Sequence, residues 1–155
     1  IKECEEKIPK YIFDGGHIHF HLRKLITSEF NNRICTFYEP ILNICPDLIY
    51  LDGPVQHSAF GDIRFISTKN QDRMPISGDI LAIEHFLQPG SLIVIDGRTA
   101  NARFLANNFQ REWAHHYSSE WDQHFFELQE SPLDIYNERM IKHCLGEGFF
   151  IRISK

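Results

Sequence analysis

Two short apolar runs, each ending in an aspartate and a glycine, constrain this chain more than any other feature. The runs are DLIYLDG at Asp47–Gly53 and SLIVIDG at Ser91–Gly97. A continuous apolar run of this length is typical of a strand that is buried on both faces of a parallel sheet. A helical pattern over 79–87 lies between them. The order strand, helix, strand therefore predicts two neighbouring parallel strands joined by a right-handed crossover.

The remaining segments alternate between strand and helix patterns. Histidines and apolar residues alternate over 17–22, which is the period of a strand, and the Asn31–Asn32 pair marks a turn. Thr99 is suited to cap the helix after the second run. The strand patterns over 113–118 and 124–128 are separated by a polar turn and predict an antiparallel hairpin. We expect strands over 17–22, 34–38, 47–51, 91–95, 113–118, 124–128 and 149–153, and helices over 2–8, 79–87, 100–110 and 132–144.

Composition places the chain among compact globular domains. Its 155 residues are 43% hydrophobic and 13% aromatic, which suffices for one core, so we expect a single domain over 1–155. A net charge of −5 argues against a nucleic-acid binder. No apolar run approaches the ~20 residues that a membrane helix needs. The four cysteines lack the spacing of a zinc site and predict thiols in a reducing cytoplasm.

The two aspartates that end the runs form the first candidate site. Ligands of open α/β sheets bind outside the carboxyl ends of the strands, and neighbouring strands lie roughly 4.8 Å apart. Asp52 and Asp96 are therefore predicted to lie side by side, where they can share a proton or a metal ion or flank a cationic ligand. Gly53 and Gly97 allow close approach of the backbone. The alternative is that each aspartate caps the turn that follows it.

The connection from the first run to the helix over 79–87 is long and rich in charge, whereas such connections usually take about 2–6 residues. The extra length indicates either a lid over the site or a segment that covers other surface. Its cations, with Arg98 after the second run, are candidates for binding an anionic or sugar-phosphate group, the alternative being solvated surface charge. They are Arg64, Lys69 and Arg73, and His57 lies in the same segment.

Residues Asp47–Phe109 resemble the second half of a Rossmann-like methyltransferase that uses S-adenosylmethionine. The resemblance is carried by an apolar strand ending in Asp-Gly, a helix, and an apolar strand after Pro-Gly. The phrases YLDGP, DILAIEHFL and VIDGRTANARFL are similar to bacterial methyltransferase-like proteins. The resemblance covers about 34–146 and implies an α/β fold with an incomplete Rossmann-like, three-layer sheet. That sheet would be mainly parallel, with a C-terminal antiparallel hairpin as its sixth and seventh strands.

The resemblance also implies elements that this chain lacks. Members of the fold bind the cofactor through a glycine-rich turn after the first strand and an acidic residue that ends the second, and neither is found. We therefore expect a domain that lacks its first two strands and binds S-adenosylmethionine weakly or not at all on its own. The implied strand order is 3-2-1-4-5-7-6, so the 47–51 strand is left with an unpaired apolar edge, which predicts a homo-oligomer.

The function that the resemblance implies for the parent protein is a cytoplasmic methyl transfer from S-adenosylmethionine to a small hydroxylated or sugar-like acceptor. The general base of that reaction, which takes the proton of the acceptor hydroxyl, would be Asp52 or His57. The catalytic candidates are Asp52, Asp96 and His57. The cofactor-binding candidates are Asp52 and Gly53, and the candidates for holding the acceptor are Arg64, Arg73 and Arg98.

Gly97 stands where metal-dependent relatives carry a second acidic or amide side chain after the fifth strand, so we expect no metal site. Two other hypotheses remain open. One is a non-catalytic α/β module for binding or assembly. The other is a metal-dependent hydrolase that uses Asp52, Asp96 and nearby histidines.

Overall fold

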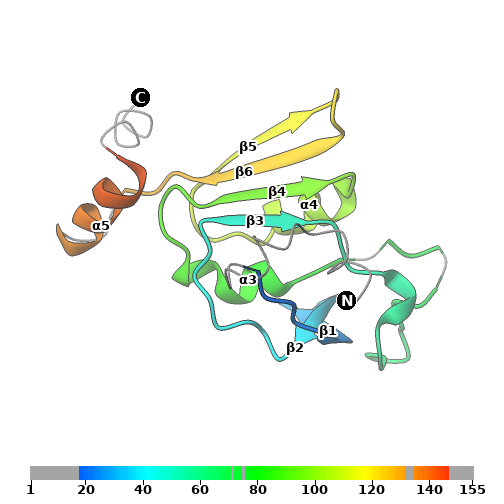
Figure 1. Cartoon of the computed structure of the whole chain (residues 1–155). Helices are drawn as coiled ribbons and strands as arrows, with labels where there is room; N and C mark the ends of the chain where they lie inside the picture. Colours follow the sequence, from blue (N-terminus) through cyan, green and yellow to red (C-terminus); the bar gives the residue numbers. More distant parts are fainter. Residues whose placement is uncertain (1–17, 71, 75, 132–134, 147–155) are drawn as a thin grey trace.

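The computed structural model describes residues 18–70, 72–74, 76–131 and 135–146 (Figure 1). The expected helix over 2–8 and strand over 149–153 lie outside this part of the chain. The described elements, in chain order, are β1 (Lys24–Phe30), β2 (Arg33–Glu39), β3 (Leu48–Leu51), η1 (Gln56–Ser58), α3 (Asp79–Ile83), η2 (Glu84–Phe86), β4 (Leu92–Asp96), α4 (Thr99–Ala106), β5 (Trp113–Ser118), β6 (Gln123–Leu128) and α5 (Ile135–Leu145).

The strands form two separate sheets (Figure 1). β1 and β2 make an antiparallel hairpin, and the second sheet has the order β3-β4-β6-β5. In the second sheet β3 and β4 run parallel, as predicted, whereas β6 is antiparallel to both β4 and β5. The expectation of a mainly parallel, Rossmann-like three-layer sheet is therefore wrong. The protein is a small mixed α/β fold in which β3–β4 is the parallel pair.

Tight turns explain why antiparallel pairing dominates. The turn between β1 and β2 consists of Asn31 and Asn32, with φ angles of 48° and 62°. Two consecutive residues with positive φ are the geometry that closes a two-residue hairpin, and asparagine tolerates it well. A second turn joins β5 to β6, so that β6 occupies the side of β4 opposite to β3. Each hairpin pairs its strands locally, whereas long connections join β3 to β4 and β4 to β6.

The strand predicted over 17–22 is wrong. Residues 18–22 have no regular secondary structure, and the strand begins later, at Lys24. The alternation over 17–22 has the period of a strand, but the turn at Asn31–Asn32 pairs β2 with the residues that directly precede the turn. As a result Leu25 is buried, whereas Leu22 is 86% exposed. The strand predicted over 34–38 is confirmed as part of β2.

One face of the four-stranded sheet forms the core together with α3, α4 and Cys35 of β2. Buried side chains alternate with half-buried ones along β4 and β6, which is the strand period of two. On α4, Ala102 and Leu105 are three residues apart and face the sheet together. The largest apolar side chains that are almost fully buried here are Ile93, Ile95, Leu105, Phe126 and Leu128.

β3 is an edge strand, and its burial differs from the prediction. Leu48 and Tyr50 are 59% and 56% exposed and alternate with the half-buried Ile49 and Leu51. The expected burial on both faces is wrong, because the face that carries Leu48 and Tyr50 is exposed. Among the described strands the outer edge of β3 is unpaired, as predicted. The oligomer expected from it stays a prediction.

The helices are shorter than their sequence patterns. The segment predicted as one helix over 79–87 divides into α3 and η2, and α4 ends at Ala106, with Asn107 as its C-cap. Thr99 does not cap α4. It is the first helical residue, and its hydroxyl bonds with His124 instead. α5 covers the described part of 132–144 and lies beyond the end of the sheet at which β4 begins (Figure 1).

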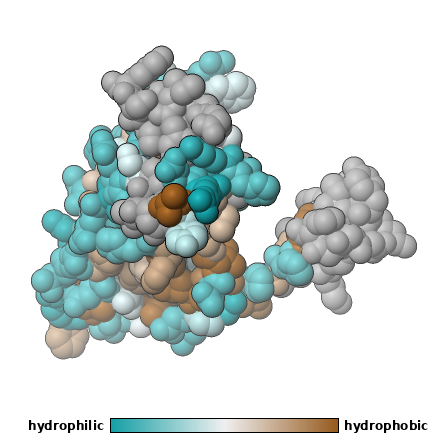
Figure 2. All heavy atoms as spheres, turned by 90° about the vertical axis from the view of Figure 1, so that its left-hand side faces the viewer, coloured by the Kyte–Doolittle hydropathy of each residue, from teal (hydrophilic) through white to brown (hydrophobic). Residues whose placement is uncertain are grey.

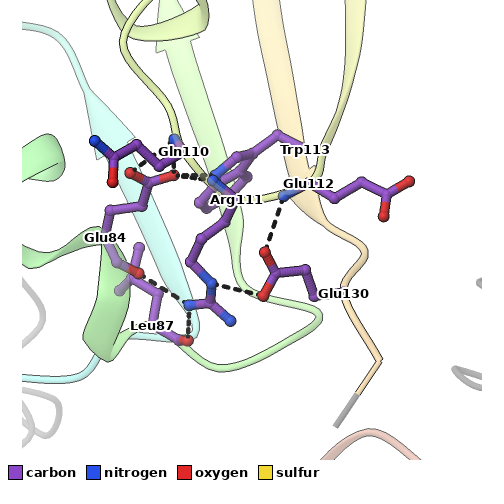
Figure 3. Close-up of polar contacts among 7 residues, drawn as sticks. All are labelled: Glu84, Leu87, Gln110, Arg111, Glu112, Trp113 and Glu130. Carbon is purple, nitrogen blue, oxygen red and sulfur yellow. Dashed lines mark hydrogen bonds and ion pairs between the residues drawn. The ribbon is translucent and has the colours of Figure 1, made fainter. Parts of the chain in front are cut away.

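A buried carboxylate joins η2 to the segment before β5 (Figure 3). Glu84 is 2% exposed, and its carboxylate accepts hydrogen bonds from the backbone N–H groups of Gln110 and Arg111 and from the Trp113 indole, at 3.0–3.2 Å. The Arg111 guanidinium donates to two backbone carbonyl oxygens at η2 and pairs with Glu130 at 2.8 Å. These contacts satisfy the buried charge and fix the β5–β6 hairpin against η2.

Candidate functional site

The carboxyl ends of β3 and β4 and the start of β6 lie at the same end of the four-stranded sheet, at the arrowheads of β3 and β4 in Figure 1. We call this end of the sheet the Asp52–Asp96 edge. The parallel register pairs Leu51 with Ile95, so that Asp52 and Asp96 follow at neighbouring positions. β6 starts at the same edge because it runs antiparallel, and Gln123 pairs with Asp96. The structure therefore brings together the two aspartates that the sequence pattern singled out.

Asp96 is held by two donors. The Tyr50 hydroxyl donates a hydrogen bond to Oδ2, and Gln123 Nε2 donates to Oδ1 at 3.3 Å. The hydrogen bond to Asp96 is also the main reason that the pKa of the Tyr50 hydroxyl is raised. Asp96 is thus fixed as an acceptor, with both oxygens in use, and Tyr50 connects it to the exposed face of β3.

Asp52 is more open than Asp96. Its side chain is 62% exposed, and Oδ1 lies 3.5 Å from Arg98 Nη2. Arg98 also donates to the backbone carbonyl oxygens of Asp52 and Pro54, at 3.4 and 3.3 Å. Its Nε is buried and has no hydrogen-bond partner among the residues that the structure describes. The hydrogen bonds of Arg98 therefore connect the end of β3 with the start of α4. The Asp52 carboxylate remains available to a ligand.

Gly53 follows Asp52 and lies beside Tyr38 of β2. A Cβ atom added at Gly53 would lie 3.5 Å from the Tyr38 hydroxyl oxygen. Burial and the charge of Asp79 raise the pKa of this hydroxyl, and the charge of Arg98 opposes them. The charges of Asp79 and Arg98 thus act on the Tyr38 hydroxyl in opposite directions.

The other predicted site residues bond elsewhere. His57 Nδ1 lies 3.3 Å from the Lys69 carbonyl oxygen, within its own segment. Arg64 pairs with Glu29 of β1 at 2.6 Å, and Arg73 donates to the Ser67 carbonyl oxygen at 2.5 Å. The contacts found for these three side chains do not bring them to Arg98 or to the two aspartates.

The long connection between β3 and α3 covers the β1–β2 hairpin. Phe60 exchanges backbone hydrogen bonds with β1, from Thr27 N–H at 2.8 Å and to the Leu25 carbonyl at 2.9 Å. Near its end, Ile76 and Gly78 bond to the backbone of Thr36 in β2. Of the two alternatives drawn from the sequence, this geometry favours a segment that covers surface rather than a lid.

A histidine pair on the β5–β6 hairpin was missed. His115 Nε2 and His124 Nδ1 lie 3.0 Å apart, and His124 Nε2 lies 3.1 Å from the Thr99 hydroxyl oxygen. Burial lowers the pKa of both imidazoles. The sequence shows that His115 and His116 face opposite ways on a strand, but the partner of His115 depends on hairpin register. The register pairs His115 with Phe126, which places His124 diagonally across.

The partners of Asp96 were missed for a related reason. Tyr50 lies within an apolar run, which is typical of a core residue. Gln123 is a single polar residue at the start of a strand, so neither residue stands out as part of a site. The available signal was positional. Tyr50 is two residues before Asp52 and hence on the same face of β3, and Gln123 opens a strand whose start lies at the same edge.

Within the described ranges, no group of three or more histidine, cysteine, aspartate or glutamate side chains is placed to hold a metal ion. None of the helices in these ranges combines the length and the apolar character that crossing a bilayer requires. Comparison of the chain with protein-family models, with curated proteins and with solved structures finds no match.

Proposed function

We propose that this chain carries the acceptor side of a methyltransferase that uses S-adenosylmethionine, and that a small hydroxylated or sugar-like acceptor binds at the Asp52–Asp96 edge. The observation that carries the proposal is the juxtaposition of these two carboxylates at the carboxyl ends of two parallel strands.

In this proposal S-adenosylmethionine supplies the methyl group, and the chain orients the acceptor and takes up its proton. Asp52 is the general base, because its carboxylate is exposed and only weakly engaged by Arg98. Asp96 accepts from Tyr50 and Gln123 and so holds the Tyr50 hydroxyl at the site, where it can bond an acceptor hydroxyl. Arg98 positions Asp52 and the backbone that follows it.

The residues at this edge fit one part of such a cofactor. As an alternative to acting as the base, Asp52 can accept hydrogen bonds from ribose hydroxyls, since Arg98 contacts Oδ1 and leaves Oδ2 available. Gly53 adds backbone without a side chain beside Tyr38. A glycine-rich turn for the remainder of the cofactor is not found in the sequence. We therefore propose weak binding by this chain alone.

Calorimetric titration with S-adenosylmethionine and S-adenosylhomocysteine tests the proposal. We expect weak binding of both, and Asp52→Asn should weaken it by about tenfold or more, because a charged acceptor is lost. Asp62→Asn is the matched control, since Asp62 is exposed on the long connection. Absence of binding by the folded chain, or equal binding by Asp52→Asn and the parent chain, would overturn the assignment of Asp52 to the cofactor.

The second candidate function is a non-catalytic module for assembly. It is favoured by the edge strand β3, whose outer edge is unpaired among the described strands and whose Leu48 side chain is 59% exposed. A row of unpaired backbone groups next to apolar side chains is a template for pairing with another chain. We propose a homo-oligomer on this ground. We also propose the reducing cytoplasm as its compartment, supported by the free thiols of Cys35 and Cys45.

A further inference from the structure

A chain of hydrogen-bonded side chains joins the start of α4 to the β5–β6 hairpin. The Thr99 hydroxyl oxygen lies 3.1 Å from His124 Nε2, and His124 Nδ1 lies 3.0 Å from His115 Nε2. A hydroxyl, an imidazole within hydrogen-bond reach of it, and a third group that orients the imidazole form the arrangement that activates a nucleophile in enzymes. The geometry of these three side chains therefore points to chemistry at Thr99.

The surroundings suit each member of this chain to its part. Thr99 is half-buried, whereas His124 is 5% exposed and lies beside the Tyr117 ring, at 4.5 Å between ring centroids. His115 stacks on Phe126 at 4.3 Å and is exposed on β5. Burial lowers the pKa of both imidazoles, so both are neutral at neutral pH and can accept a proton.

The turn between β4 and α4 fixes the position of Thr99. Gly97 has a φ of 59°, which allows a sharp turn after β4, and Thr99 is the first residue of α4. The Ala102 N–H group bonds to the Arg98 carbonyl at 3.0 Å, and the N–H groups before it belong to the helix start, where intrahelical acceptors are lacking. One of them is the Ala100 N–H group, which follows Thr99. In enzymes whose nucleophile lies in a strand-to-helix turn, the N–H group of the next residue stabilises the oxyanion.

We propose that Thr99, His124 and His115 form a second site, which hydrolyses esters of small acyl groups. The Thr99 hydroxyl oxygen forms a bond to the acyl carbon while its proton passes to His124 Nε2, and the Ala100 N–H group stabilises the negative carbonyl oxygen. His124 then gives this proton to the leaving alcohol oxygen as the ester C–O bond breaks. A water molecule next attacks the acyl carbon and gives a proton to His124 Nε2. That proton returns to the Thr99 oxygen as the acyl–threonine bond breaks and the carboxylic acid leaves.

His115 is a positioning residue in this reaction. The Thr99 hydroxyl can donate to His124 Nε2 only when the proton of the neutral His124 ring is on Nδ1, and His115 Nε2 is the acceptor that holds it there. His115 then carries its own proton on Nδ1. The same contact stabilises the imidazolium that His124 becomes when it takes the hydroxyl proton.

This site does not depend on the proposed methyl transfer. Ile95 of β4 pairs with the buried His124, whereas Asp96 pairs with Gln123, so the two sites use opposite faces of the sheet. Figure 2 views the molecule from the side at which β3 and β4 begin and shows apolar surface gathered there. Thr99 follows the other end of β4, so this apolar face does not contact an ester at Thr99, which favours a small acyl group.

Hydrolysis of p-nitrophenyl acetate, followed by absorbance and by mass spectrometry of acid-quenched samples, tests the proposal. We expect the parent chain to release nitrophenolate and to carry a transient acetyl group on Thr99. Thr99→Val is nearly isosteric and lacks the hydroxyl, so it should lower the rate by about a hundredfold or more, whereas Thr99→Ser should retain activity. Equal rates for the parent chain and Thr99→Val, or acetylation confined to other residues, would overturn the proposal.

Variants of the histidines separate the base from its positioning residue. His124→Gln removes the base and should lower kcat by about a hundredfold or more. His115→Leu removes the acceptor of the His124 Nδ1–H group and should lower kcat by about tenfold with KM unchanged, whereas the side-chain oxygen of His115→Gln can still accept and should restore most of the loss. His116→Gln, on the opposite face of β5 and exposed, is the matched control and should keep the parent rate.

The tautomer of His124 gives a readout that needs neither activity nor a folded variant. Long-range proton–nitrogen NMR correlations of the imidazole rings in the parent chain distinguish the two tautomers. We expect the proton of each ring, His124 and His115, on Nδ1. A proton on His124 Nε2 would show that the Thr99 hydroxyl accepts rather than donates and would overturn the proposal.

Discussion

Tyr50 and Asp96 lie on neighbouring parallel strands, and the Tyr50 hydroxyl donates a hydrogen bond to the Asp96 carboxylate at the end of β4. The contact crosses the sheet on its more exposed face, where Tyr50 is 56% exposed. It explains why an aromatic residue in an otherwise apolar run is not part of the core. It also ties the chemistry of the site to the register of β3 on β4, since a one-residue slip would turn Tyr50 to the opposite face.

Replacing Asp96 should lower the pKa of the Tyr50 hydroxyl toward its ordinary value. The hydrogen bond to the carboxylate, together with its charge, is what raises that pKa, and Asp96→Asn removes the charge. Absorbance titration of the tyrosines in the alkaline range measures the change. Tyr50→Phe identifies which part of the curve belongs to Tyr50, and Asp62→Asn is the control for a distant carboxylate. An unchanged curve for Asp96→Asn would contradict the contact.

Removing the Glu84 carboxylate should destabilise the protein strongly. Glu84→Ala leaves the backbone N–H groups of Gln110 and Arg111 and the Trp113 indole without their acceptor, and we expect a loss of about 3–5 kcal/mol in the free energy of unfolding. Glu84→Gln should cost less, roughly 1–2 kcal/mol, because a single oxygen placed at Oε1 still reaches all three donors.

Urea unfolding followed by tryptophan fluorescence measures both losses, since Trp113 belongs to the network (Figure 3). Glu112→Ala is the matched control, because the Glu112 side chain is exposed and only its backbone N–H group contacts Glu130. It should change the free energy of unfolding by no more than about 0.5 kcal/mol. Equal losses for Glu84→Gln and Glu84→Ala would show that geometry at Oε1 is not what matters.

Local patterns predicted the part of the fold that local contacts determine. The parallel β3–β4 pair, the β5–β6 hairpin and most of α4 follow from continuous apolar runs, a polar turn and a helical period. β1 could not be placed in this way, because 17–22 has a clearer alternation than 24–30. The position of the Asn31–Asn32 turn relative to β2 decides between the two, and that is a pairing between strands rather than a property of either segment.

The candidate site was predictable to the same extent. Asp52 and Asp96 were placed correctly because they end two strands whose direction the crossover fixes. The partners of His115 could not be read from the sequence, since a diagonal contact with His124 requires the register of the hairpin. Grouping Arg64 and Arg73 with Arg98 assumed that the long connection returns to the site. Its backbone hydrogen bonds go to β1 and β2 instead.

The His115–His124 pair should make stability fall as the pH is lowered. Burial lowers the pKa of both imidazoles from 6.5, so the folded state binds fewer protons than the unfolded state around that pH. The contribution is therefore present above the unfolded-state value and is lost as the pH falls through the lower folded-state values. Urea unfolding at a series of pH values measures the free energy of unfolding as a function of pH. Its slope against pH should be shallower for His124→Gln than for the parent chain. His85→Gln, at an exposed position, should keep the parent slope.

The unpaired edge of β3 should make the chain associate. Leu48 and Tyr50 are exposed beside backbone groups that no described strand satisfies, and pairing of this edge with a second copy would cover both. Size-exclusion chromatography with light scattering should give at least the mass of a dimer. Leu48→Lys should shift it toward monomer, because a charge on an edge strand blocks pairing. Trp121→Lys, at an exposed hairpin tip, should leave it unchanged. A monomeric parent chain would refute the edge as an interface.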